Sequence, residues 1–304
     1  MKQDLLEISD LIVDYDRETL RRVPVDKQSV VDRLLAVRDR RAARIVQRMP
    51  DIDGIIDPDY VDRLLVRVHC EMQRLSEEFQ HGRRVYELLQ TVVAALGSAR
   101  VPPPYRIVDV GCGSGFVIRW LAAHARFNED VELLGVDFNE ALVDEANRLA
   151  GMEQLNCSFE VANAFELARP ANVLMSTGVV HHFRGNDLTS FFQQHDQPAV
   201  HAFLHFDFQP NPLAGPGAWL FHYIRMRKPL SRHDGVVSAL RAHTTEALSE
   251  AAVGAGFQCG IYSARFWRTP MQRVFHTLIG LRSPLIEPFQ AELGARRGRW
   301  EPTR

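Results

Sequence analysis

The stretch Arg106-Ile-Val-Asp-Val-Gly-Cys-Gly-Ser-Gly115 decides the fold of this chain. Its apolar residues predict a buried strand, which breaks directly into alternating glycines at 111, 113 and 115. Helix-like sequence follows at once, over residues 116–124. A strand, a glycine turn and a helix in this order let the backbone approach an adenosine-containing cofactor, because a side chain would block the turn or the ligand. The sequence therefore predicts a cofactor loop here.

The spacing of the third glycine argues against a dinucleotide cofactor. The dinucleotide fingerprint G-x-G-x-x-G requires its last glycine at the position of Phe116, but this chain has it one residue earlier, at Gly115. An acidic residue, Asp109, stands two positions before the first glycine. This arrangement argues against a nucleotide-binding oxidoreductase, which stays a minor alternative.

The pattern Asp109-x-Gly111-x-Gly113-x-Gly115 resembles the first motif of class I S-adenosylmethionine (SAM) dependent methyltransferases. In that family the loop, which includes the position of Cys112, wraps the amino-acid end of SAM through backbone contacts. The acid at the Asp109 position orients the loop and the methionine portion. The resemblance implies an enzyme that uses SAM and releases S-adenosylhomocysteine.

Length and composition suggest an ordinary globular protein. The 304 residues fit one domain with an appendage, and 46% hydrophobic, 24% charged residues and a net charge of −2 indicate neither a nucleic-acid surface nor an acidic partner. The four cysteines are scattered, so we expect no zinc site and no disulfide framework. No apolar run is long enough to span a membrane and no signal peptide is recognisable, so a cytoplasmic location is expected. The basic run at 296–299 is expected to be a solvated tail.

The chain changes character near residue 100. Residues 1–100 have mostly helical periodicity, clearest over 62–96, where Gly82 is expected to interrupt the helix. The stiff segment Val101-Pro-Pro-Pro104 then marks a domain boundary. We therefore expect an N-terminal helical region at 1–100, serving as a cap or in homodimer formation, and a SAM-binding domain at 101–304.

Strands and helices alternate after Pro104. Strands are predicted at 106–110, 131–136, 157–161, 171–176 and 199–206, helices at 116–124, 139–151, 187–194 and 245–255, and a final strand pair at 257–266 and 274–281. This alternation predicts an α/β fold with a doubly wound, mostly parallel, Rossmann-like sheet. The resemblance implies seven strands ending in a hairpin.

Ligands of such sheets lie over the carboxyl ends of the strands, so we expect the residues that follow each strand to contact the cofactor. Asp137 follows the second strand, where an acid can accept hydrogen bonds from both ribose hydroxyls, although a helix cap is an alternative reading. Phe138 is placed to pack on the adenine face. After the third strand, the resemblance assigns Asn163, Ala164 and Phe165 to contacts with the adenine ring, the alternative for Asn163 being an ordinary loop residue.

The segment Ser176-Thr-Gly-Val-Val-His-His-Phe183 follows the fourth strand and resembles a segment of small-molecule methyltransferases of the ubiquinone-biosynthesis type. The resemblance implies that Thr177 and Gly178 line the SAM pocket. The proline and tyrosine typical of enzymes that methylate DNA bases are absent from it, which argues against a nucleic-acid substrate. His181 is the first candidate for a base that deprotonates a hydroxyl acceptor, and His182 the second. Pocket lining without catalysis is the alternative for both.

A long connection at 207–243 separates the fifth strand from the next helix. It resembles an insert of bacterial methyltransferases near polyketide or phenolic-lipid pathways, and we expect it to form a lid over the acceptor site. Its His233 and Asp234 are either a second acid–base pair or a pair that ties the loop down.

The expected function is methyl transfer from SAM to a small aromatic or polyketide-like acceptor. A hydroxyl oxygen is the favoured methyl acceptor atom, and carbon or nitrogen methylation is the alternative. In-line displacement needs alignment and exclusion of water, and no metal site is expected. A noncatalytic SAM-binding scaffold is the competing function of another class.

Overall fold

The computed structural model describes residues 5–127, 130–167, 169–254, 256–264, 274–295 and 298–302. Contacts divide the chain into two compact units, a helical unit of residues 1–75 and 210–242, and a sheet unit of residues 76–209 and 243–304. This division differs from the boundary expected near residue 100. The reason is that helix α5 (His81–Ser98) packs its apolar side into the core of the sheet unit.

The sheet unit is built on one mixed sheet. Its strands are β3 (Tyr105–Val110), β4 (Val131–Asp137), β5 (Ser158–Val161), β6 (Val173–Thr177), β7 (Ala202–Phe208), β8 (Gln258–Ala264), β9 (Phe275–Leu281) and β10 (Gly298–Pro302). They lie in the order β10-β8-β9-β7-β6-β3-β4-β5. Strands β3 to β7 pair in parallel, whereas β9 pairs antiparallel with both β7 and β8. The doubly wound sheet with a terminal hairpin is confirmed; residues 265 and 266 of the predicted hairpin lie outside the described residues.

An eighth strand, β10, extends the predicted seven-stranded sheet at its edge. It pairs antiparallel with β8, Trp300 lying opposite Tyr262. Residues 298–299 of the expected tail thus belong to a strand, while 296 and 297 lie outside the described residues. The indole of Trp300 is only 7% exposed and meets the ring of Phe289 edge-on, with 6.0 Å between centroids. Packing of the Trp300 ring against Phe289 thus stabilises β10 at the sheet edge. The basic residues at 296–299 gave no indication of this strand.

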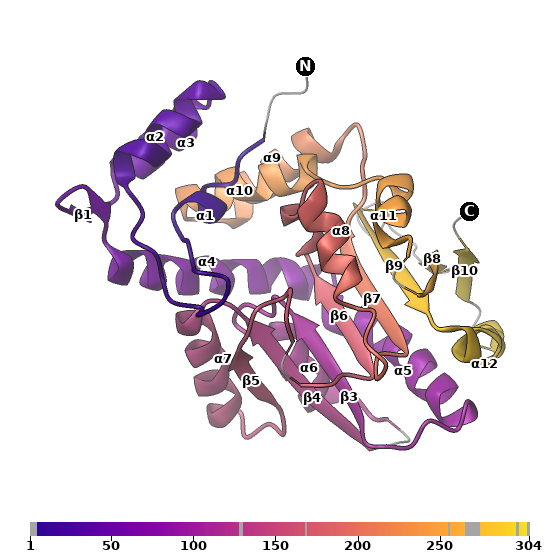
Figure 1. Ribbon diagram of the computed structural model, residues 1–304. Helices are drawn as coiled ribbons and strands as arrows, with labels where there is room; N and C mark the ends of the chain where they lie inside the picture. The colour runs from indigo at the N-terminus through magenta and orange to yellow at the C-terminus, as the bar shows by residue number, and fades with distance from the viewer. Residues whose placement is uncertain are drawn as a thin grey trace. The chain divides into compact units, whose positions relative to one another are not determined.

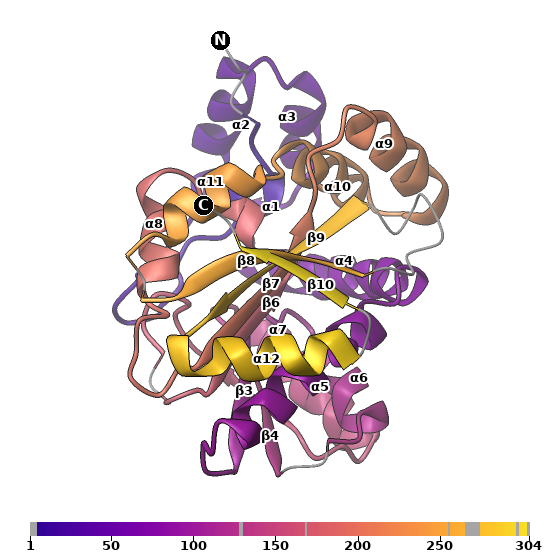
Figure 2. The same ribbon diagram turned by 90° about the vertical axis from the view of Figure 1, so that its right-hand side faces the viewer.

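Helices cover both faces of the sheet (Figures 1 and 2). On one face, α5, α6 (Phe116–His124), α7 (Glu140–Met152) and α12 (Ser283–Ala295) contribute to one hydrophobic core. On the other face, α8 (Asn186–Gln193) and α11 (Thr245–Ala252) contribute to a second core. Burial on both sides explains why the parallel strands are continuous apolar runs.

Gly82 does not interrupt the long helical segment, contrary to expectation. The break between α4 (Pro58–Glu78) and α5 lies at Gln80, whose φ is 55°. Gly82 lies inside α5, where an added Cβ would stand 2.3 Å from the Trp120 ring. The glycine therefore permits close packing of α5 against α6 rather than a turn.

The helical unit combines the N-terminal region with the insert that follows β7. It contains α1 (Ile8–Leu11), α2 (Lys27–Ala36), α3 (Arg40–Gln47), the short strands β1 (Asp51–Ile52) and β2 (Ile55–Ile56), most of α4, α9 (Ala214–Arg225) and α10 (Pro229–Leu240). The Asp234 carboxylate in α10 accepts hydrogen bonds from the backbone N–H groups of Ile8 and Ser9, at 2.9 and 2.8 Å. The insert is thus folded together with the N-terminal helices. Among the described helices, none has the length and apolarity that crossing a membrane requires.

Candidate functional site: a glycine loop and a histidine–aspartate pair

The glycine turn has a backbone that only glycine adopts without strain. Gly111, Gly113 and Gly115 have φ values of 71°, 54° and 74°. A Cβ on Gly115 would lie 2.3 Å from the Phe159 ring, and one on Gly111 would lie 2.8 Å from the Val179 side chain. The turn, which follows β3, is therefore packed closely between Phe159 of β5 and Val179, which follows β6.

Asp137, at the end of β4, holds this turn in position. Its Oδ2 accepts a hydrogen bond from the Gly113 N–H at 2.9 Å, and its Oδ1 accepts one from the Asn139 N–H at 3.0 Å. The cap of α7 is Asn139, whose side chain accepts from the Leu142 N–H. Asp137 is therefore not the helix cap, and its predicted contact with ribose stays a prediction. Phe138 beside it is 47% exposed, as an adenine-stacking residue would be.

Asp109 introduces a poorly compensated acid beneath the turn. The residue is 2% exposed, and its Oδ1 has no hydrogen-bond partner among the described residues. Burial, and then the charge of Asp137, raise the pKa of the Asp109 carboxyl to about 8. Burial, reinforced by the same two carboxylates, also raises the pKa of the Cys112 thiol. A cationic ligand beside the turn would favour the ionised form of the Asp109 carboxyl, and SAM carries both an ammonium and a sulfonium group.

The predicted adenine segment after β5 is tied to the end of β4. The Ala162 N–H donates to the carbonyl of Asp137 at 3.0 Å. The Asn163 side chain accepts from the Phe165 N–H at 2.9 Å, which makes a local turn. Ala164 and Phe165 pack partly buried against the second core. The structure thus brings this segment to the same edge of the sheet as the glycine turn, and the contact with adenine stays a prediction.

The segment after β6 makes a second tight turn at this edge. Gly178 has a φ of 70°, and its N–H donates to the carbonyl of Phe206 at 2.8 Å. The space beside Gly178 is open, since no atom lies within 4 Å of an added Cβ. The hydroxyl of Thr177 is buried without a partner among the described residues. Both features suit a segment that lines a ligand.

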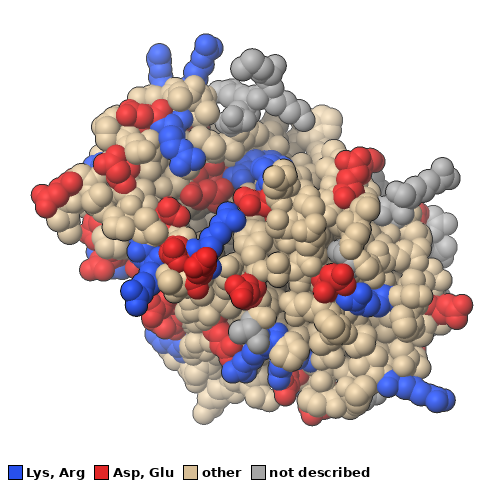
Figure 3. Space-filling view, viewed as in Figure 1, with Lys and Arg blue, Asp and Glu red and all other residues tan. Residues whose placement is uncertain are grey.

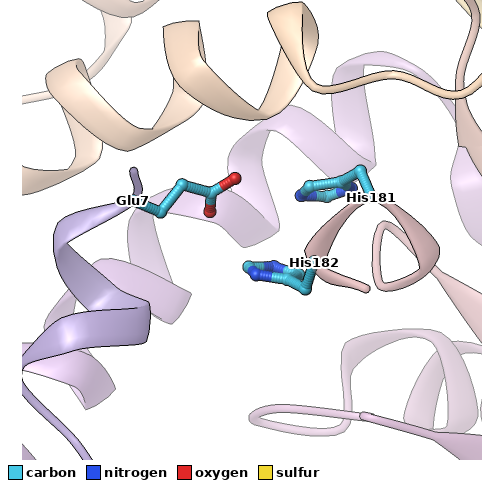
Figure 4. Close-up of side chains that lie close together, drawn as sticks. All are labelled: Glu7, His181 and His182. Carbon is cyan, nitrogen blue, oxygen red and sulfur yellow. The ribbon is translucent and has the colours of Figure 1, made fainter. Parts of the chain in front are cut away.

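His181 and His182 follow in a single turn of 3-10 helix, at Val180–His182. Figure 4 shows their two imidazole rings projecting side by side, and the ring centroids are 4.4 Å apart. His181 is 3% exposed, and its Nδ1 lies 2.8 Å from Oδ1 of Asp207. The other oxygen of Asp207 accepts from the backbone N–H of His181 at 3.0 Å. Asp207 is therefore hydrogen-bonded to both the ring and the backbone N–H of His181.

Asp207 stays ionised in this buried position. Burial alone would raise the pKa of its carboxyl, but the charge and hydrogen bonds of His181, with the backbone N–H of Phe208, hold that pKa well below its ordinary value. An ionised carboxylate accepts the Nδ1–H of the imidazole, which leaves Nε2 as the nitrogen that carries the lone pair. The pair is thus arranged to take up a proton at Nε2 of His181.

Comparison with known proteins finds a similarity in the part of the chain that contains the glycine turn. Residues 107–197 match the family model described as a methyltransferase domain. This match to a methyltransferase domain covers less than a third of the chain. SAM is the cofactor that such a domain uses. The matched segment contains the glycine turn, Asp137 and His181 but ends before Asp207.

Similarity beyond this segment is limited. The 24-methylenesterol C-methyltransferase 2 of Oryza sativa subsp. japonica is 37% identical over 90 residues, which are 29% of this chain and 20% of that protein. Among solved structures, magnesium protoporphyrin IX methyltransferase from Synechocystis PCC 6803 has a TM-score of 0.43 at 19% identity, covering 85% of this chain and 100% of that one. An O-methyltransferase family protein from Burkholderia thailandensis has a TM-score of 0.47 at 17% identity, covering 74% and 60%. None of these likenesses identifies an acceptor for this chain.

His233, the third predicted catalytic histidine, lies in the helical unit rather than in the methyltransferase domain. Its Nδ1 lies 2.6 Å from Oδ1 of Asp234, and its Nε2 lies 2.8 Å from Oδ2 of Asp39. Burial alone would lower the pKa of the ring, but the two carboxylates raise it above its ordinary value. Both ring nitrogens are thus engaged in joining α10 to the start of α3, which is the arrangement of a residue that ties the insert down.

Asp207 is the residue that the sequence did not assign. Its position at the end of β7 is the signal that could have found it, because an acid at a strand end of such a sheet faces the ligand edge. What the sequence could not show is that β7 lies beside β6, so that Asp207 meets His181.

Proposed function

We propose that this protein transfers a methyl group from SAM to a hydroxyl group of a small-molecule acceptor, with His181 as the general base. The observation that carries the proposal is the buried His181–Asp207 pair at the same sheet edge as the glycine turn. Asp109, Gly111, Cys112, Gly113 and Gly115 would hold the methionine portion of SAM. The remaining cofactor contacts would come from Asp137, Phe138, Asn163, Ala164, Phe165, Thr177 and Gly178.

SAM supplies an electrophilic methyl group whose bond to sulfur breaks with the electron pair going to sulfur. The chain has to align the acceptor oxygen with that methyl group and remove the hydroxyl proton. Asp207 holds the Nδ1–H of His181, so the proton would move to Nε2 as the oxygen–carbon bond forms. The positive imidazole would then be stabilised by the Asp207 carboxylate until the proton is released.

The surface supports a small-molecule acceptor. On the face shown in Figure 3, acidic and basic side chains are interspersed among uncharged ones, without a continuous basic stripe of the kind that tracks nucleic acid. The insert at 207–243 would supply part of the acceptor cover, and homodimer formation through the N-terminal helices and a cytoplasmic location stay predictions. Methylation of carbon or nitrogen is the second candidate reaction, because an acceptor that is already anionic needs no base.

The test is product analysis with a panel of phenols, quinols and hydroxy-pyrones. We expect SAM-dependent addition of one methyl group to oxygen, identified by mass spectrometry and fragmentation. His181→Asn should lower kcat by about 10²-fold or more, whereas its neighbour His182→Asn serves as the matched control with a smaller effect. Near-normal turnover by a folded His181→Asn protein would overturn the base assignment. SAM binding without any product across a broad panel would favour the scaffold.

A further inference from the structure

Helix α9 of the helical unit has its apolar side facing outward. Apart from the partly buried Phe221, its large apolar side chains are exposed by 50% or more, namely Leu213 just before the helix, Trp219, Leu220, Tyr223 and Ile224. The only buried side chain of the helix is that of His222. Residues 213, 220 and 224 recur at helical spacing, with 219 and 223 beside them, so the exposed residues form one continuous stripe. Helices on protein surfaces have the opposite arrangement.

The inner side of α9 is fixed within the helical unit. Helix α9 packs along α10, as Figure 2 shows. A Cβ on Gly235 of α10 would lie 2.0 Å from the His222 ring, so the two helices are in close contact at that point. Burial lowers the pKa of His222 to about 4, outweighing the charge of Glu71, so the buried His222 ring is neutral at physiological pH. The contacts with α10 therefore leave the apolar stripe on the opposite, exposed side of α9.

Basic residues lie at the end of α9 and directly after it, close to the apolar stripe. Residues 208–233 contain no Asp or Glu, but they contain Arg225, Arg227, Lys228 and Arg232, in a chain whose net charge is −2. Arg225 and Arg227 are exposed. The guanidinium of Arg232 lies 5.2 Å from the centroid of the Tyr223 ring. The nearby acid Glu71 is turned inward, where it accepts hydrogen bonds from the backbone N–H groups of Arg227 and Lys228.

Two stacked aromatic rings complete the surface. Trp219 and Tyr223 lie with centroids 5.4 Å apart and 15° between their planes. Amphipathic rings of this kind favour the region between lipid headgroups and acyl chains, and basic side chains nearby add attraction to anionic headgroups. A water-soluble acceptor or an acidic peptide would explain the charges but not an outward stripe of leucine and isoleucine.

We infer that α9, with the basic residues that follow it, docks this protein on an anionic phospholipid surface. The stripe of Leu213, Trp219, Leu220, Tyr223 and Ile224 would enter the interface, while Arg225, Arg227 and Lys228 contact headgroup phosphates. The helix would lie on the membrane without crossing it. The inference is independent of the proposed methyl transfer, because docking needs neither SAM nor an acceptor.

The test is co-sedimentation of the full chain with vesicles, measured without SAM. We expect binding to phosphatidylcholine vesicles that contain 30% phosphatidylglycerol, and weaker binding to pure phosphatidylcholine. The double variant Leu220→Gln/Ile224→Gln should reduce the partition coefficient at least about tenfold, because two exposed apolar anchors are lost. Its matched control is Ile52→Gln, a change at an exposed isoleucine elsewhere in the helical unit, which should bind like the wild type.

A second pair of variants separates charge from apolar contact. Arg227→Gln/Lys228→Gln should weaken binding to anionic vesicles about tenfold and leave binding to neutral vesicles unchanged, with Arg48→Gln as control. Absence of binding by the wild type, or binding that ignores both double variants, would overturn the inference. So would conversion of a dimeric wild type to a monomer by Leu220→Gln/Ile224→Gln without any vesicle binding, which would make the stripe an interface between two copies.

Discussion

Replacement of Gly115 by alanine tests the account of the glycine turn, because the structure separates two costs. Alanine at a φ of 74° costs about 1–2 kcal/mol relative to glycine. Its Cβ would also lie 2.3 Å from the Phe159 ring and 3.0 Å from the Ala146 Cβ, which forces repacking at about 1–3 kcal/mol. Gly115→Ala should therefore lower the free energy of unfolding by about 2–5 kcal/mol.

Alanine substitutions at two other glycines separate the backbone cost from the packing cost. Gly178 has nearly the same φ, 70°, but open space around its Cβ position, so Gly178→Ala should show the backbone cost alone. Gly151 lies within α7 with open space, so Gly151→Ala should be neutral or stabilise by up to about 1 kcal/mol. Urea denaturation without SAM, followed by circular dichroism, measures all three. If Gly115→Ala is no more destabilising than Gly178→Ala, the turn is not packed as described.

Three further predictions concern titratable groups. Because burial and then a neighbouring carboxylate raise the pKa of Asp109 to about 8, a cationic ligand should favour its ionised form. SAM binding should then release protons at pH 7 and tighten from pH 6 to pH 8, as calorimetry in buffers of different ionisation heat would show; Asp109→Asn should abolish the release. The carboxylates of Asp234 and Asp39 outweigh burial and raise the pKa of His233 above its ordinary value of 6.5. The contribution of protonated His233 to stability is therefore complete below pH 6.5 and is lost as the pH rises through the raised pKa. The difference in melting temperature between wild type and His233→Gln should therefore shrink from pH 6 to pH 9, and a constant difference would contradict the assignment. Asp207→Asn turns an amide N–H₂ towards Nδ1 of His181, which moves the ring proton to Nε2; kcat should fall about 10²-fold while the dissociation constant of SAM stays unchanged, and a parallel loss of SAM binding would indicate a structural role instead.

Local sequence patterns predicted most of the sheet unit. Helix α6 has the predicted bounds, and β4 differs by the single residue Asp137, because alternating apolar runs and glycine turns are short-range signals. Residue Trp300 shows the limit, since its burial depends on α12, to which no local pattern connects it. The pairing of strands β6 and β7 likewise decided that Asp207 meets His181.

The helical unit was predicted less completely for a similar reason. Its helices were expected from periodicity, but the insert after β7 and the first helix are far apart in the chain. The hydrogen bonds from Ile8 and Ser9 to Asp234 join them, and these depend on tertiary folding. Sequence reasoning placed His233 and Asp234 as either catalytic or structural, and their contacts within the unit favour the second interpretation.

We propose that the turn from Asp109 to Gly115 binds SAM. Isothermal titration of the full chain with SAM, S-adenosylhomocysteine and NADH tests it most directly. We expect micromolar binding of both SAM and S-adenosylhomocysteine and no binding of NADH. Failure of both sulfur ligands to bind, or binding of NADH in their place, would contradict it.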